Sequence, residues 1–139
     1  MNSLNSDYKL YLKLLRPWQW AKNTLIIIPI VLSNSFGLDK FLDSVGIFFL
    51  FSFYVSGNYI LNDLNDIDLD RNHPEKKYRP IASGKVSEKV AKRIAYFLLI
   101  SSLLITFINY EVEIVYLYLI YLFIAMVYTK SLKFVNYLI

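Results

Sequence analysis

The sequence contains no cysteine, a single histidine, and only four glycines and four prolines among its 139 residues. Without cysteine the chain has no disulfide scaffold, thiolate metal site or cysteine nucleophile, and one histidine cannot build a histidine-based zinc site. Charged residues are scarce as well, at 19%, whereas soluble domains carry about 25%. These deficits exclude an ordinary soluble enzyme.

Apolar side chains take the place of the missing charges: 56% of the residues are hydrophobic, 17% are aromatic, and the mean hydropathy is +0.40. They come in long blocks, which excludes a disordered chain and indicates membrane-spanning segments. We therefore predict an all-α fold, a multi-span transmembrane helical bundle of about four spans. The apolar stretches are 24–33, which is short and would borrow 18–23, and then 45–61, 94–108 and 112–128.

The first 23 residues form a separate segment in which lysines and an arginine alternate with leucines and tyrosines. The lysines interrupt the apolar run and no small-residue cleavage site follows, so this segment is not a signal peptide. We predict an amphipathic helix on the cytoplasmic membrane face, ended by Pro17, with Trp18 and Trp20 at the level of the lipid headgroups. The membrane domain then covers residues 24–139.

The distribution of Lys and Arg predicts the topology. The N-terminal 23 residues hold four of them, the segment 34–44 one, residues 62–93 eight, the turn 109–113 none and the tail after Tyr128 two. Because Lys and Arg accumulate on the cytoplasmic side of membranes, both chain ends and the 62–93 segment are expected in the cytoplasm. We therefore expect a multi-pass protein of the cell (inner) membrane with its active face cytoplasmic.

An acidic stripe follows the second apolar stretch, and the chain between that stretch and Pro74 contains no proline. If the helix continues through Asp70, then Asn62, Asp66 and Asp70 share one helix face at steps of four residues, and Asp63 joins them. Stacked carboxylates repel one another and are costly next to a bilayer, so a cation is expected to compensate them. Hard oxygen ligands of this kind suit Mg²⁺, which bridges carboxylates to substrate phosphates.

A basic run, Arg71, Lys76, Lys77 and Arg79, follows the acidic stripe. Carboxylates next to cations at a membrane surface are what a diphosphate–Mg²⁺ complex requires, because the metal neutralises the leaving diphosphate and Lys or Arg bind its remaining oxygens. Two simpler interpretations stay open. An acidic helix end is usually a solvated face, and a basic run is often a topology determinant or an anionic-lipid contact.

Other chemistries are less well supported by the sequence. An EF-hand calcium loop fails, because its glycine position holds Arg71 and its glutamate position holds Lys77. The tyrosines along the spans could line a cleft for a prenyl chain, although ordinary helix packing explains them as well. His73-Pro74 is expected to end the acidic helix, and Ser83-Gly84 to form a turn before the third span.

The spacing Asn62-x-x-x-Asp66-x-x-x-Asp70 at the end of a membrane helix resembles the first aspartate-rich motif of the UbiA superfamily of intramembrane prenyltransferases. Two flanking segments, RPWQWAKN at 16–23 and HPEKKYRPIASG at 73–84, are similar to the branch of decaprenyl-phosphate phosphoribosyltransferase-like enzymes. This resemblance covers roughly residues 10–135. It implies a larger α-helical membrane bundle with a Mg²⁺-bridged pyrophosphate site that faces the cytoplasm.

Carried over to this chain, the resemblance implies that Mg²⁺ is held by Asn62, Asp63, Asp66 and Asp70, with Asp66 and Asp70 as the catalytic residues. Four further residues would contact substrate phosphates: Lys22, Asn23, Lys77 and Arg79. The family's second polar motif, carried in the other half of the fold, is absent. We therefore expect the N-terminal half of a UbiA-type fold, completed by a missing C-terminal half or within a homo-oligomer.

The favoured activity is Mg²⁺-dependent transfer of phosphoribosyl from phosphoribosyl pyrophosphate (PRPP) to a polyprenyl phosphate, by positioning and electrostatic stabilisation. Prenyl transfer from a prenyl diphosphate to an aromatic or lipid acceptor would use the same carboxylates, so the aspartates do not separate the two. A non-catalytic four-helix membrane protein is the third interpretation, and it would tolerate Asn at positions 66 and 70. Membrane lipids are expected partners and nucleic acid is not.

The topology can be tested by labelling cysteines, which the chain naturally lacks. In intact cells a membrane-impermeant maleimide should label a cysteine in the 109–113 turn, near position 110, and should not label Lys85→Cys. Both positions should react after the cells are permeabilised. Labelling of position 85 in intact cells would contradict the topology and the cytoplasmic location of the phosphate donor.

Overall fold

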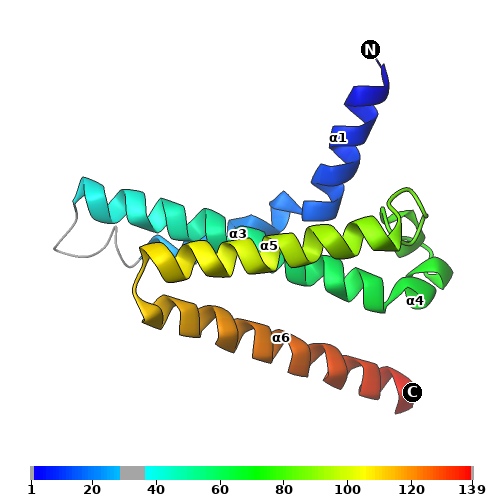
Figure 1. Ribbon diagram of the computed structural model, residues 1–139. Coiled ribbons are helices and arrows are strands. Elements are labelled where there is room, and N and C mark those ends of the chain that lie inside the picture. The colour runs from blue at the N-terminus through cyan, green and yellow to red at the C-terminus, as the bar shows by residue number, and fades with distance from the viewer. Residues whose placement is uncertain (1, 29–36, 139) are drawn as a thin grey trace.

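The computed structural model describes residues 2–28 and 37–138, and this part of the chain is helical with no β-strand (Figure 1). A short helix and a 3₁₀ helix come first, three long helices make up the body, and two small helical elements lie between the first and second of these. In chain order they are α1 (Asn2–Leu15), η1 (Pro17–Ile26), α3 (Leu38–Asn65), α4 (Ile67–Asn72), η2 (Lys76–Tyr78), α5 (Glu88–Asn109) and α6 (Val112–Leu138).

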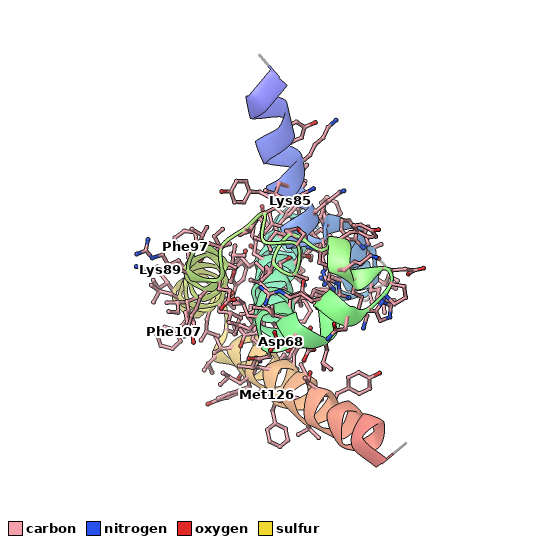
Figure 2. The ribbon with its side chains drawn as sticks, turned by 90° about the vertical axis from the view of Figure 1, so that its right-hand side faces the viewer. Asp68, Lys85, Lys89, Phe97, Phe107 and Met126 are labelled. Carbon is pink, nitrogen blue, oxygen red and sulfur yellow. The ribbon has the colours of Figure 1, made fainter. Side chains whose placement is uncertain are left out.

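Three helices in the described residues are long and apolar enough to cross a membrane: α3, α5 and the first 18 residues of α6. They contain the second, third and fourth apolar stretches, so the predicted all-α membrane bundle is confirmed. Figure 2 shows Phe97 and Phe107 on the outer side of α5, where 70% and 61% of their surfaces are exposed. Side chains of this kind suit contact with lipid tails rather than water.

The first predicted span lies only partly within the described residues. Residues 24–26 end the 3₁₀ helix η1, and 29–36 lie outside the described residues. The break at Pro17 is confirmed, because α1 ends at Leu15 and η1 begins at Pro17. Between them Arg16 is left-handed, with φ 54° and ψ 52°. A proline disfavours the right-handed helical conformation of the residue before it, which accounts for the end of α1 at this position.

A row of polar contacts holds η1 against α3. The indole N–H of Trp20 donates to Ser56 Oγ at 2.9 Å, and the Asn23 amide donates to Ser52 Oγ at 3.0 Å. Ser56 Oγ in turn donates to the backbone oxygen of Leu15 at 2.7 Å. Both serines are completely buried. Because buried polar groups are costly without partners, these bonds fix the position of η1 along α3.

Helices α3 and α5 run side by side (Figure 1) and pack closely at Gly57. A Cβ atom at this position would lie 2.9 Å from the carbonyl oxygen of Ala95 and 2.9 Å from Leu99 Cγ. Ala91 and Ala95 on the facing side of α5 have no exposed surface. Small residues on both helices therefore allow the two backbones to pack closely, as is common in membrane bundles.

We expect Gly57→Ala to lower the thermal stability of the protein in detergent, measured by circular dichroism. The added methyl group meets backbone that cannot move aside, so overpacking of about 1–3 kcal/mol should outweigh the higher helix propensity of alanine. Gly37→Ala is the matched control, since a Cβ there meets nothing within 4 Å. Equal melting temperatures for the two variants would contradict a tight α3–α5 contact.

Candidate functional site

A cavity of about 660 Å³ lies where the end of α3, α4 and η2 meet the middle of α6. One part of its wall is polar and charged, and the other part is aromatic and aliphatic. The polar lining consists of Arg16, Asn58, Asn62, Asp63, Asp66, Asp70, His73, Lys76, Arg79 and Thr129. The remaining lining consists of Tyr59, Leu69, Tyr121, Ile124, Ala125 and Tyr128.

The sequence suggested that the acidic stripe lies on one uninterrupted helix, and this expectation is wrong. Helix α3 ends at Asn65, Asp66 has φ −111° and ψ 14°, and α4 starts at Ile67. Asp and Asn side chains compete for backbone hydrogen bonds and weaken a helix, and this segment is rich in both. The backbone N–H groups of Asp66 and Asp70 still bond to the residues four positions earlier. The stripe therefore keeps its spacing, and all of its members line the cavity.

Asp63 is the centre of a charged network. Arg16 Nη2 lies 2.6 Å from both carboxylate oxygens of Asp63, and Arg79 Nη1 lies 2.9 Å from Asp63 Oδ1. The same Arg79 nitrogen lies 2.6 Å from Asp70 Oδ2. Only 6% and 3% of the Asp63 and Asp70 side chains are exposed. Buried carboxylates need such charged partners, so each arginine compensates a charge that would otherwise be very costly.

Each arginine is brought to the cavity by its own local structure. Arg16 occupies the left-handed turn between α1 and η1, and its guanidinium lies 5.3 Å from the centre of the Tyr59 ring. Arg79 begins a compact turn in which Ser83 N–H donates to the Arg79 carbonyl and Val86 N–H to the Pro80 carbonyl, both at 2.9 Å. Pro80, Ile81, Ala82 and Val86 are buried and anchor this turn.

Five of the residues proposed from the sequence come together in this cavity: Asn62, Asp63, Asp66, Asp70 and Arg79. Three others are not among the described residues that line it. Lys22 is exposed on η1, and the Asn23 amide is used in the contact with Ser52. Lys77 is exposed, with its ammonium group 5.2 Å from the Tyr78 ring.

Three further residues line the cavity: sequence reasoning did not propose Arg16 or His73 for the site, and it named Lys76 only as a member of the basic run. A signal existed for two of them. Arg16 opens the RPWQWAKN segment, and Lys76 stands next to Lys77 in the basic run. Nothing in the sequence showed that a residue 47 positions before Asp63 would pair with it.

Three of the cavity residues carry oxygen atoms of the kind that Mg²⁺ prefers. The amide of Asn62 and the carboxylates of Asp66 and Asp70 offer hard oxygen atoms to one cavity. Within residues 2–28 and 37–138, no group of three or more His, Asp or Glu side chains could hold a metal ion unaided. Mg²⁺ commonly takes one or two carboxylates from a protein and fills its shell with water and substrate phosphates.

These features define a polytopic helical membrane protein with a half-polar, half-apolar cavity that combines carboxylates and arginines. Residues 25–138 match the model of the UbiA prenyltransferase family, and the chain therefore belongs to this family of membrane transferases.

Among its curated relatives is the decaprenyl-phosphate phosphoribosyltransferase of Mycobacterium tuberculosis, which is 38% identical over 96 residues, or 66% of this chain and 32% of that protein. The digeranylgeranylglyceryl phosphate synthase of Methanocaldococcus jannaschii is 36% identical over 107 residues, or 73% of this chain and 35% of that protein. The nodulation protein NoeC of Azorhizobium caulinodans is 38% identical over 78 residues, or 55% and 25%. The chain spans about a third of the length of the phosphoribosyltransferase and synthase relatives.

We expect Asp63→Asn to destabilise the protein strongly, because Arg16 would lose its carboxylate partner and Arg79 would keep only Asp70. Breaking a buried ion pair by removing one partner costs about 3–5 kcal/mol. Asp68→Asn is the control, since 96% of the Asp68 side chain is exposed and its pairing with Arg71 is loose, at 3.5 Å. Thermal unfolding should separate the two variants clearly. A melting temperature unchanged by Asp63→Asn would show that the network does not stabilise the fold.

Proposed function

We propose that this protein contributes the first acidic motif of a Mg²⁺-dependent transferase that moves phosphoribosyl from PRPP to a polyprenyl phosphate. The observation that carries the proposal is the cavity, in which Asn62, Asp66 and Asp70 face the same space as Arg16 and Arg79. Carboxylates suit a metal–diphosphate complex and guanidinium groups suit phosphate oxygens, so one cavity offers both halves of such a site. The relatives named decaprenyl-phosphate phosphoribosyltransferase support this choice of reaction.

The proposed reaction is displacement of pyrophosphate from PRPP by an oxygen of the lipid phosphate. Bound Mg²⁺, held by Asn62, Asp66 and Asp70, would neutralise charge on the leaving pyrophosphate. Arg16, Lys76 and Arg79 bind the remaining phosphate oxygens, and three cations are enough for a donor that carries two separate phosphate groups. These side chains act by binding and orienting the donor, since no proton transfer is needed for pyrophosphate to leave.

The apolar wall of the cavity suits the lipid substrate. Tyr121, Ile124, Ala125 and Tyr128 all come from α6, opposite the acidic stripe. A polyprenyl phosphate has one anionic end and a long apolar chain, which matches a cavity with one charged and one apolar side. In this proposal the apolar wall also keeps water away from the reacting phosphoribosyl group, and so limits hydrolysis of the donor.

The proposal gives Asp63 a different role from the magnesium ligand that the resemblance implied. Because both of its oxygens bond to Arg16 and one also bonds to Arg79, it positions the two arginines rather than serving as a main metal ligand. The remainder of the reaction site would come from the rest of a UbiA-type fold or from a second copy of the chain. The site would face the cytoplasm, where a soluble donor such as PRPP is available.

Prenyl transfer is the second candidate, because a relative 36% identical over 73% of this chain is named digeranylgeranylglyceryl phosphate synthase. A prenyl diphosphate would place its diphosphate on the same carboxylates and arginines and its chain along the α6 wall. The two candidates differ in the donor. PRPP is charged at both ends, whereas a prenyl diphosphate is charged at one end only.

Calorimetric titration of the purified protein with PRPP or geranylgeranyl diphosphate, each with and without Mg²⁺, tests the proposal. We expect Mg²⁺-dependent binding of PRPP that is lost in Asp66→Asn. Arg79→Ala should weaken it by about 1.5–3 kcal/mol, the loss expected for a hydrogen bond to a charged group. Lys22→Ala is the control, since Lys22 is exposed outside the cavity.

Binding of the prenyl diphosphate but not of PRPP would favour prenyl transfer. Unchanged PRPP binding in Asp66→Asn would mean that Asp66 does not take part in binding the donor. Arg79→Lys provides a further check, because it keeps the positive charge for Asp63 and Asp70 but removes the planar guanidinium group that can bind two phosphate oxygens at once.

A further inference from the structure

His73 is the chain's only histidine, and the proposed reaction leaves it without a role although it lines the cavity. It follows the last residue of α4, and its backbone is extended, with φ −84° and ψ 137°. Its ring nitrogen Nδ1 accepts hydrogen bonds from the backbone N–H groups of Glu75 at 3.2 Å and Lys76 at 3.3 Å. Its carbonyl oxygen accepts from Lys77 N–H at 3.3 Å.

These bonds arise from the local sequence. Pro74 has no backbone N–H, so the first donors available after His73 are those of Glu75 and Lys76. They belong to the beginning of the 3₁₀ helix η2, where N–H groups have no partner within the helix. The imidazole supplies that partner, and so it ties the end of α4 to the beginning of η2.

The rotation of η2 decides which lysine reaches the cavity. A 3₁₀ helix has three residues per turn, so neighbouring side chains diverge by about 120° and those three apart are aligned. Lys76 and Arg79 are three apart, and both line the cavity. Lys77 lies on another side, with its ammonium group over the Tyr78 ring. A change in the rotation of η2 would therefore exchange one lysine for the other.

We propose that His73 is a positioning residue whose Nδ1 sets the rotation of η2, so that Lys76 joins Arg79 as a cation for a phosphate group. This inference rests on the proposed function, because it assigns the anion that Lys76 meets to the phosphorylated donor. A neutral imidazole that accepts at Nδ1 carries its proton on Nε2. The histidine thereby acts through the backbone of Glu75 and Lys76.

Side-chain replacements can separate Nδ1 from Nε2. His73→Asn places an amide oxygen near the position of Nδ1, whereas His73→Gln places its amide near that of Nε2. Binding of inorganic pyrophosphate with Mg²⁺ should stay within about twofold of wild type in His73→Asn. It should weaken about tenfold in His73→Gln, His73→Ala and Lys76→Ala, as expected when one hydrogen bond between charged groups is lost.

Two further comparisons show whether the histidine acts through Lys76. In the His73→Ala background, Lys76→Ala should add less than about twofold, because the lysine has already left the cavity. Lys77→Ala is the matched control and should change pyrophosphate binding less than about twofold in the wild-type background. Full additivity of His73→Ala and Lys76→Ala, or a large loss in Lys77→Ala, would overturn the inference.

Readouts that need no ligand test the geometry directly. Because the chain has one histidine, ¹⁵N-histidine labelling gives the signals of His73 alone, and at mildly alkaline pH these should show the Nε2–H tautomer. The amide protons of Glu75 and Lys76 should exchange slowly in wild type and His73→Asn, and faster in His73→Gln. The Nδ1–H tautomer, or equal exchange in all variants, would overturn the inference.

The two proposals fail in different ways. Wild-type protein that binds no pyrophosphate would overturn the proposed function, and with it the assignment of Lys76 to a phosphate group. Normal pyrophosphate binding by wild type and by His73→Gln alike would overturn only the positioning role of His73.

Discussion

The buried carboxylate of Asp63 joins three parts of the chain that are far apart in sequence. It lies on the last turn of α3 and binds Arg16 from the α1–η1 turn and Arg79 from the segment after η2. Burying these charges is costly, and the cost is compensated only while they stay together with Asp70, which also pairs with Arg79. The cavity depends on this interaction, because the two arginines form its cationic side and their position follows from that of Asp63.

The helices around the charged network are held in place by a few specific contacts. The close approach of α3 and α5 requires Gly57 opposite Ala95, and the position of η1 depends on the bonds that Trp20 and Asn23 make to buried serines of α3. In a membrane these contacts matter because lipid tails are as apolar as leucine, so small residues and hydrogen bonds give helix pairs their specificity. The RPWQWAKN segment thus has a structural role, since most of it docks η1 and only Arg16 lines the cavity.

The charged side of the cavity is held by many contacts within the chain, and the apolar side is held by few. The acidic stripe and Arg79 are fixed by the buried network and by the anchored turn after Arg79. Helix α6 packs lightly instead: 11% of its spanning window is buried, compared with 44% for α3. The apolar wall therefore depends on what surrounds α6 in the membrane more than the charged side does.

The sequence alone determined the membrane class, the all-α fold and the acidic face of the site, because apolar block length, charge distribution and four-residue spacing are local properties of the chain. It could also place the helix ends at Pro17 and His73-Pro74, where proline restricts the backbone. The choice of cations was decided only by the tertiary structure. Arg16 pairs with a residue 47 positions away, and Arg79 pairs with the same residue from 16 positions further along the chain. Both depend on how distant segments pack, which no local spacing records.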